Sequence, residues 1–275
     1  MLLHNLENSF LASYRIPRPT YSGPRKLPAA LAPVWVELRD GRTRPAFRIG
    51  YDLLRSKSLS DEHRAALLSA LATAAFDNGM YKVARQMAHD SLALYSNQWL
   101  AHRTLLSIYI AEKDYRAAAE HLKSVTPPAR SRGWDEPLTR TDRHVLRAAC
   151  AWMTKSWDQT AAQLLLAFPA GVASMPPVLQ EDWFRLAFYR ERPADAEEAA
   201  RELIKNKSTD KADVLIQTLV RRGWHKEALA LYRDIYDLDP TNELLRRRVV
   251  GLCIREGQVQ EARRLMELGA LRLAS

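Results

Sequence analysis

Apolar residues recur at every third or fourth position through most of this chain, which is the spacing of amphipathic helices. The stretch AALLSALATAAF at residues 65–76 is an example. Ser60 precedes it as a helix N-cap, and Asp61 and Glu62 place two acids in the first turn. Strand-like alternation of apolar and polar residues does not extend over any useful length. From about Pro33 onward, the pattern therefore predicts short helices separated by turns.

The chain repeats part of this pattern at a fixed interval. The stretch RRGWHKEALALY at 221–232 is matched 34 residues later by REGQVQEARRLM, with Arg, Gly, Glu, Ala and Leu in the same places. The stretch DNGMYKVARQMA at 77–88 is matched at the same interval by AEKDYRAAAEHL. Weaker copies lie at 39–56, 155–166 and 191–204. A pair of antiparallel helices cannot bury its apolar face alone, so the sequence predicts an all-α protein of stacked helix pairs.

This repeat resembles the tetratricopeptide repeat (TPR) family over roughly residues 40–270. The resemblance rests on turn glycines, on aromatic residues after the turn and on small residues at the helix contacts: Gly79, Gly223, Gly257; Tyr81, Tyr115, Trp157; Ala84, Ala118, Ala228, Ala262. Pro240 stands where the family has the proline of its inter-repeat turn. The chain departs from the family at Lys113, which replaces a turn glycine, and at Arg190, where an aromatic residue is usual. The resemblance implies a right-handed α-solenoid of about seven helix pairs over residues 29–275, with an insertion loop near 124–140.

Charge and cysteine content limit which kinds of partner and which cellular compartment fit the chain. There are 41 Lys and Arg against 32 Asp and Glu, and the formal net charge of +9 favours a negatively charged partner. The hydrophobic content of 47% excludes disorder for most of the chain. Cys150 and Cys253 stand alone in apolar helical stretches, which fits packing residues in a reducing compartment. We expect a cytoplasmic protein without a membrane span, with an organelle transit peptide as the alternative for the N-terminus.

Residues 1–28 predict a flexible, basic, proline-rich arm. Four prolines and no acid lie in residues 13–28, so neither helix nor strand should persist there. Its basic residues are Arg15, Arg18, Arg25 and Lys26. The arm either lies across the body or hangs free. Both the arm and the arginine-rich final unit at 243–275 offer sites for phosphates, although arginine enrichment for solubility explains them as simply.

The sequence contains no recognisable catalytic or metal-binding motif. Gly-rich phosphate loops, GxSxG and HExxH are all absent. His102 and His121 could meet on facing helices, but a structural zinc site normally takes four closely spaced ligands. Adjacent acids such as Glu197 and Glu198 point apart on a helix and indicate solvated surface. We therefore expect neither enzyme activity nor a cofactor or metal.

The main functional signal is a set of arginines beside aromatic residues. In TPR proteins the first helix of each pair lines a concave groove. The resemblance places the following residues towards it: Arg103, Trp152, Phe184, Arg185, Phe188, Arg192, Arg221, Arg247 and Arg255. Guanidinium groups make bidentate contacts with carboxylates and phosphates, which suits an acidic or phosphorylated segment. The alternative is that Trp152, Phe184 and Phe188 are core residues and that Arg247 lies on a solvated face.

These features predict a non-enzymatic scaffold or adaptor that binds an acidic peptide or protein segment in the groove. The lysine-and-asparagine clamp by which some TPR proteins bind chaperone tails is absent from the corresponding helices. Two alternatives remain open. One is a nucleic-acid-binding helical repeat, for which the irregular middle spacing argues against a base-by-base RNA code but not against backbone binding. The other is a regulatory or sensor domain whose groove binds a small peptide or the chain's own arm.

Overall fold

The computed structural model describes residues 9–14, 16, 29–56, 59–125, 138–205 and 209–273, and for 209–211 and 269–273 it describes the backbone alone. Within these ranges every regular element is helical, with fifteen α-helices and two short 3-10 helices. The chain forms two compact units. The N-terminal unit comprises residues 13–167, and the C-terminal unit comprises 168–275 together with the described residues 9–12. The predicted all-α fold is confirmed.

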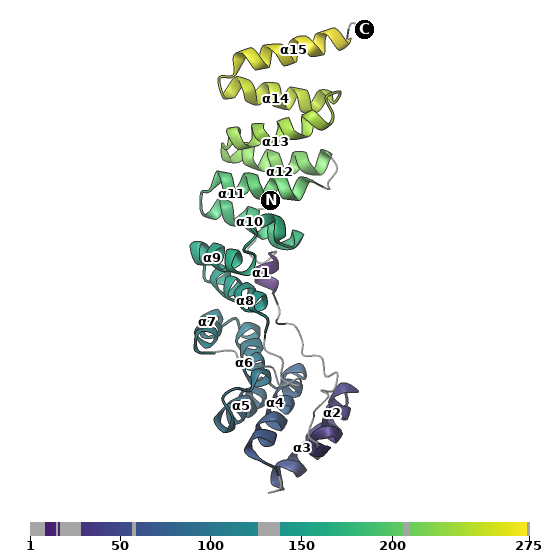
Figure 1. Ribbon diagram of the computed structural model, residues 1–275, viewed down its shortest axis with the longest axis vertical. Helices are drawn as coiled ribbons and strands as arrows, with labels where there is room; N and C mark the ends of the chain where they lie inside the picture. Colours follow the sequence, from purple (N-terminus) through teal and green to yellow (C-terminus); the bar gives the residue numbers. More distant parts are fainter. Residues whose placement is uncertain are drawn as a thin grey trace. The chain divides into compact units, whose positions relative to one another are not determined.

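Helices pair with their neighbours in sequence within each unit (Figure 1). The N-terminal unit contains the pairs α2 (Ala32–Arg39) and α3 (Thr43–Arg55), α4 (Asp61–Asp77) and α5 (Tyr81–Leu94), α6 (Trp99–Ala111) and α7 (Tyr115–Ser124), and α8 (Arg140–Met153) and α9 (Trp157–Ala167). The C-terminal unit contains α10 (Pro177–Tyr189) and α11 (Pro193–Ile204), α12 (Thr209–Arg222) and α13 (His225–Leu238), and α14 (Glu243–Arg255) and α15 (Val259–Leu273). The remaining elements are α1 (Phe10–Ser13), η2 (Ala29–Leu31) and η3 (Val172–Ser174). Consecutive pairs also contact each other within a unit, as expected for stacked repeats.

One turn geometry joins the two helices of every pair. Each turn contains one residue with φ between 52° and 87°: Gly41, Gly79, Lys113, Lys155, Glu191, Gly223 or Gly257. Backbone N–H groups at and after this residue donate to carbonyls in the last turn of the preceding helix, for example Gly79 to Phe76 at 2.9 Å and Met80 to Ala75 at 2.9 Å. This is the Schellman arrangement, which satisfies carbonyls at the helix end. Seven such turns define seven helix pairs among the described residues, and Lys113 takes the place of a turn glycine.

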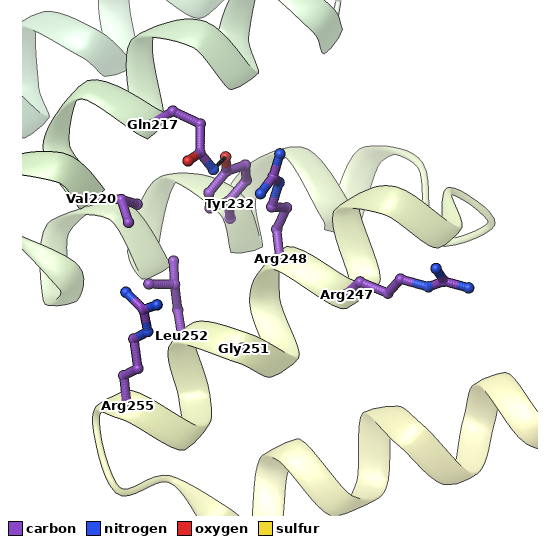
Figure 2. Close-up of a pocket in the computed structure, with 8 residues that line it drawn as sticks. All are labelled: Gln217, Val220, Tyr232, Arg247, Arg248, Gly251, Leu252 and Arg255. Carbon is purple, nitrogen blue, oxygen red and sulfur yellow. Dashed lines mark hydrogen bonds between the residues drawn. The ribbon is translucent and has the colours of Figure 1, made fainter.

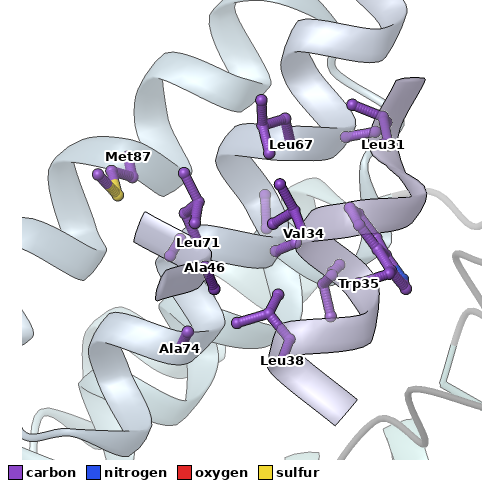
Figure 3. Packing of buried hydrophobic residues seen from close by; sticks show 14 of the residues in the cluster. Leu31, Val34, Trp35, Leu38, Ala46, Leu67, Leu71, Ala74 and Met87 are labelled. Atoms are coloured by element: carbon purple, nitrogen blue, oxygen red, sulfur yellow. The ribbon is translucent and has the colours of Figure 1, made fainter. Parts of the chain in front are cut away.

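Small residues and leucines fill the contacts between helices. Ala84, Ala118, Ala228 and Ala262 are all buried, so the helices that carry them approach closely at these points. In the N-terminal unit, Leu31, Val34, Trp35 and Leu38 pack with residues of α3, α4 and α5 in one core cluster, part of which Figure 3 shows.

Helix termini and polar contacts follow the local sequence. Ser60 caps α4 by accepting a hydrogen bond from the His63 backbone N–H, and Asp61 and Glu62 occupy its first turn as predicted. Between α4 and α6, the buried hydroxyls of Thr73 and Thr104 are 2.8 Å apart and hydrogen-bonded. Cys150 and Cys253 are buried free thiols, as expected for packing residues.

Candidate functional site

The three aromatic residues predicted for the groove lie in the helix core. Trp152 is 1% exposed, Phe184 3% and Phe188 6%. The ring centroids of Phe184 and Phe188 are 5.0 Å apart, and Phe188 lies 4.5 Å from the Trp224 ring. These rings stabilise the stack of helices, and in this structure they offer no surface to a partner. Of the residues predicted for the groove, the arginines are therefore the remaining candidates.

Two of the predicted arginines are partly buried and engaged with neighbouring groups. In the N-terminal unit, burial and the Asp142 charge raise the pKa of Tyr14, and the positive charge of Arg103 on α6 opposes that rise. In the C-terminal unit, Arg185 on α10 is 12% exposed, and its Nη1 lies 2.9 Å from the Asp182 carboxylate. Arg192 and Arg221 are exposed at the ends of the α10–α11 and α12–α13 turns.

The structure gathers the other two predicted arginines, Arg247 and Arg255, into one pocket. Arg248 joins them, and all three belong to α14. The pocket has a volume of about 190 Å³, and α12 and α13 complete its lining. Its lining residues are Gln217, Val220, Tyr232, Arg247, Arg248, Gly251, Leu252 and Arg255. The set contains three cationic side chains and no carboxylate, so the pocket favours an anion.

Figure 2 shows how α14 presents these groups. The Arg248 and Arg255 side chains extend from the same side of the helix, on either side of Leu252, and Arg247 extends outwards. Gly251 lies between them on α14, and a Cβ built at this position would meet no atom within 4 Å. The missing side chain therefore leaves open the space between the arginines.

Polar groups from α12 and α13 hold the inner side of the pocket. Tyr232 donates a hydrogen bond to Asp213, and its hydroxyl accepts one from the Gln217 amide at 2.6 Å. Burial is the main cause that raises the pKa of Tyr232, and the hydrogen bond to Asp213 adds to it, so the phenol stays neutral. Arg248 Nε lies 3.5 Å from Asp213 Oδ1. This ion pair holds the Arg248 guanidinium on its inner side, while the side chain stays partly exposed at 41%.

The two outer arginines have weaker constraints. Arg247 is 75% exposed, and its Nε donates to Glu243 at 2.9 Å in an i,i+4 pair on α14. Arg255 Nη1 lies 3.5 Å from Nε2 of His225, the first residue of α13. Exposed ion pairs of the Arg247 type contribute little to stability and exchange partners readily. Both guanidinium groups are therefore able to reorient towards an incoming carboxylate or phosphate.

Sequence reasoning placed Arg248 only in the arginine-rich final unit, and it did not single out Tyr232 or Gln217. A signal for Arg248 was present in the run Arg246–Arg248, and Gly251 in the middle of a helix was another, because an interior glycine lowers helix propensity unless close approach or space requires it. Tyr232 and Gln217 gave no signal, since their role depends on how α12 and α13 pack against α14.

His102 and His121 do meet, as their placement on facing helices suggested. His102 Nδ1 lies 3.1 Å from His121 Nε2, and His102 Nε2 lies 2.8 Å from the Ser96 carbonyl oxygen. Burial lowers the pKa of both rings, that of His121 to about 4, where the charges of His102 and His89 add to the effect. In the part of the chain that the structure describes, no cluster of three or more His, Cys, Asp or Glu residues is arranged to hold a metal ion.

Other predictions fall where the structure gives no description. The basic arm residues Arg15, Arg18, Arg25 and Lys26 lie outside the described residues, as do residues 126–137 of the predicted insertion. Within the early part of the predicted arm, Leu11, Tyr14 and Ile16 are buried. Among the helices of the described ranges, none combines the length and the apolar character needed to cross a membrane.

The chain has an all-α helical-repeat fold, and three arginines line a pocket in its C-terminal unit. No protein-family model matches the chain, and no curated protein matches it in sequence. Among solved structures, the chain is similar to the assembly chaperone of RpL4 (Acl4, residues 1–338). The two share 14% sequence identity, the alignment covers 85% of this chain and 97% of that chain, and the TM-score is 0.41.

Proposed function

We propose that this chain is a TPR-like, non-enzymatic interaction protein that binds an acidic polypeptide segment through the arginine pocket of its C-terminal unit. The observation on which the proposal rests is that Arg247, Arg248 and Arg255 all line one pocket whose lining contains no acid. A glutamate or aspartate side chain seated there would replace water as the acceptor for these guanidinium groups. Charge-assisted hydrogen bonds of this kind are roughly twice as strong as neutral ones.

The surroundings of the pocket favour a polypeptide ligand. Leu252 and Val220 supply an apolar floor beside the charged groups, and Tyr232 and Gln217 supply fixed polar groups. A peptide side chain with an aliphatic stem and a carboxylate tip matches this combination of apolar and cationic surface.

The test measures binding of a fluorescein-labelled hexaglutamate peptide to the full chain by fluorescence anisotropy at low salt. We expect Arg247→Ala/Arg255→Ala to weaken binding about tenfold, because two charge-assisted contacts are lost. The matched control is Arg263→Ala/Arg264→Ala on α15, where both residues are exposed and the same charge is removed outside the pocket. This control should change affinity less than about twofold.

A second variant separates shape from charge. Gly251→Leu adds a side chain into the open space between the arginines without changing net charge, and we expect it to weaken hexaglutamate binding as well. Equal losses in the pocket variant and the α15 control would contradict the proposal. A single-stranded oligonucleotide provides the comparison with nucleic acid. If it binds more tightly than the peptide, with a steep salt dependence and the same loss in both double variants, the nucleic-acid alternative is the better account.

A further inference from the structure

A second feature of the C-terminal unit lies at α10, apart from the arginine pocket. The carboxylate of Asp182 is fully buried, with 0% of its side chain exposed. Its Oδ2 accepts a hydrogen bond from the Leu11 backbone N–H at 2.8 Å, and the Phe10 backbone N–H donates to the same carboxylate. Its Oδ1 accepts from Arg185 at 2.9 Å. A residue 171 positions away in sequence thus supplies a principal partner of a buried charge.

Burying a carboxylate costs free energy, so the presence of Asp182 in the core needs a physical reason. Burial raises the pKa of Asp182 to about 6, although the hydrogen bonds from Leu11, Arg185 and Phe10 oppose this rise. An apolar residue at this position of α10 would suit the core better if stability of the stack were the sole requirement. What the carboxylate provides instead is an acceptor for main-chain N–H groups.

The bound segment is one short helical turn. Ser9 Oγ accepts a hydrogen bond from the Ala12 backbone N–H at 2.8 Å, which closes the helical turn of α1. The Leu11 side chain is buried at 1% exposure. The gain from one buried aliphatic side chain and two main-chain hydrogen bonds opposes the entropy lost in ordering four residues. These opposing terms are of similar size, which is the balance expected of a segment that opens locally without unfolding the unit.

We propose that Asp182 and Arg185 form a peptide-docking site on α10 and that residues Ser9–Ala12 occupy it as a ligand within the same chain. The site binds the first-turn N–H groups of a short helical segment. That segment carries a polar residue that caps the turn and a leucine two positions later. In the intact chain this segment excludes a second segment of the same kind. Removal of the segment makes the site available in trans.

The first experiment uses hydrogen exchange on the full chain. We expect the Phe10 and Leu11 amides to exchange at least tenfold faster than core amides of α13, which would report local opening. Asp182→Ala should speed exchange at these two amides by a further tenfold or more, because their acceptor is gone. Glu198→Ala is the matched control, since Glu198 is an exposed carboxylate on α11 of the same unit. If the two amides exchange only with global unfolding, the segment is a fixed part of the fold and the proposal fails.

The second experiment measures binding in trans. A labelled peptide with the sequence of residues 1–12 is titrated into the intact chain and into a variant that lacks these residues. We expect saturable binding to the truncated chain, at least tenfold weaker binding to the intact chain, and at least a tenfold loss when the peptide carries Leu11→Ala. Equal binding to both chains, or no binding to a truncated chain that retains its helical circular dichroism, would overturn the proposal. Hexaglutamate binding is measured in parallel, because it depends on a different site.

Discussion

Three turns of this protein hold a residue with a side chain where the backbone favours glycine. Lys113, Lys155 and Glu191 have φ values of 62°, 58° and 52°. A left-handed backbone brings the Cβ of an L-residue close to the following carbonyl oxygen, at a cost of roughly 1–2 kcal/mol. Glycine removes this cost but adds about 0.5–1 kcal/mol of conformational entropy to the unfolded state. The difference predicts that Lys113→Gly raises the free energy of unfolding of the N-terminal unit by about 0.5–1 kcal/mol.

Two further variants test whether backbone strain causes the predicted change in the free energy of unfolding. Lys113 is exposed, so Lys113→Ala removes the side chain and keeps the strained φ; we expect a change below about 0.3 kcal/mol. Gly79 occupies the same position in the preceding pair, and a Cβ there would meet no atom within 4 Å. Gly79→Ala should therefore cost about 0.5–1 kcal/mol through backbone strain alone, without any steric clash.

Urea unfolding followed by far-UV circular dichroism measures these differences. With a slope of about 2 kcal/mol per molar urea, Lys113→Gly should raise the midpoint of the N-terminal unit by about 0.3–0.5 M, and Gly79→Ala should lower it by a similar amount. If Lys113→Ala stabilises as much as Lys113→Gly, the gain comes from the lost side chain and the reasoning is refuted. A neutral Gly79→Ala would refute it as well, since the turn would then carry no strain.

Three other predictions concern buried groups. The pKa of His121 is lowered to about 4, so the unfolded chain binds this proton more readily than the folded chain. The free energy of unfolding should therefore fall as pH drops from about 6.5 towards about 4, by on the order of 2–3 kcal/mol in urea melts. His121→Gln should reduce this dependence, and His63→Gln should leave it unchanged. Phe188→Ala should destabilise the C-terminal unit by about 3–5 kcal/mol in the same assay, and a loss below about 1 kcal/mol would show that the ring is not a core residue. Thr73→Val and Thr104→Val should each lower the free energy of unfolding by about 1–2 kcal/mol. A double-mutant cycle should show coupling, because each substitution removes the other residue's hydrogen-bond partner. Additive losses would argue against the hydrogen bond.

The positions of the predicted groove residues show which features helical periodicity can predict and which it cannot. Arg247 and Arg255 were predicted from their register on a first helix, and both line the pocket. Phe184 and Phe188 had the same kind of register, yet they are buried. Helical periodicity tells which residues share a face, but a first helix has neighbours in its own pair and in the next pair. The sequence does not tell which part of the face those neighbours cover.

The sequence by itself determined the helix pairs, their number and the small residues at their contacts, because these depend on patterns local to each repeat. Gly79 forms the turn that the repeat pattern predicts, and Ala84 lies at a helix contact that the same pattern predicts. The tertiary structure alone decided that Tyr232 and Arg248 share a pocket and that Leu11 is bound to Asp182. Each of these depends on contacts between segments distant in sequence, and the free energy of packing those segments outweighs the local preferences that a pattern records.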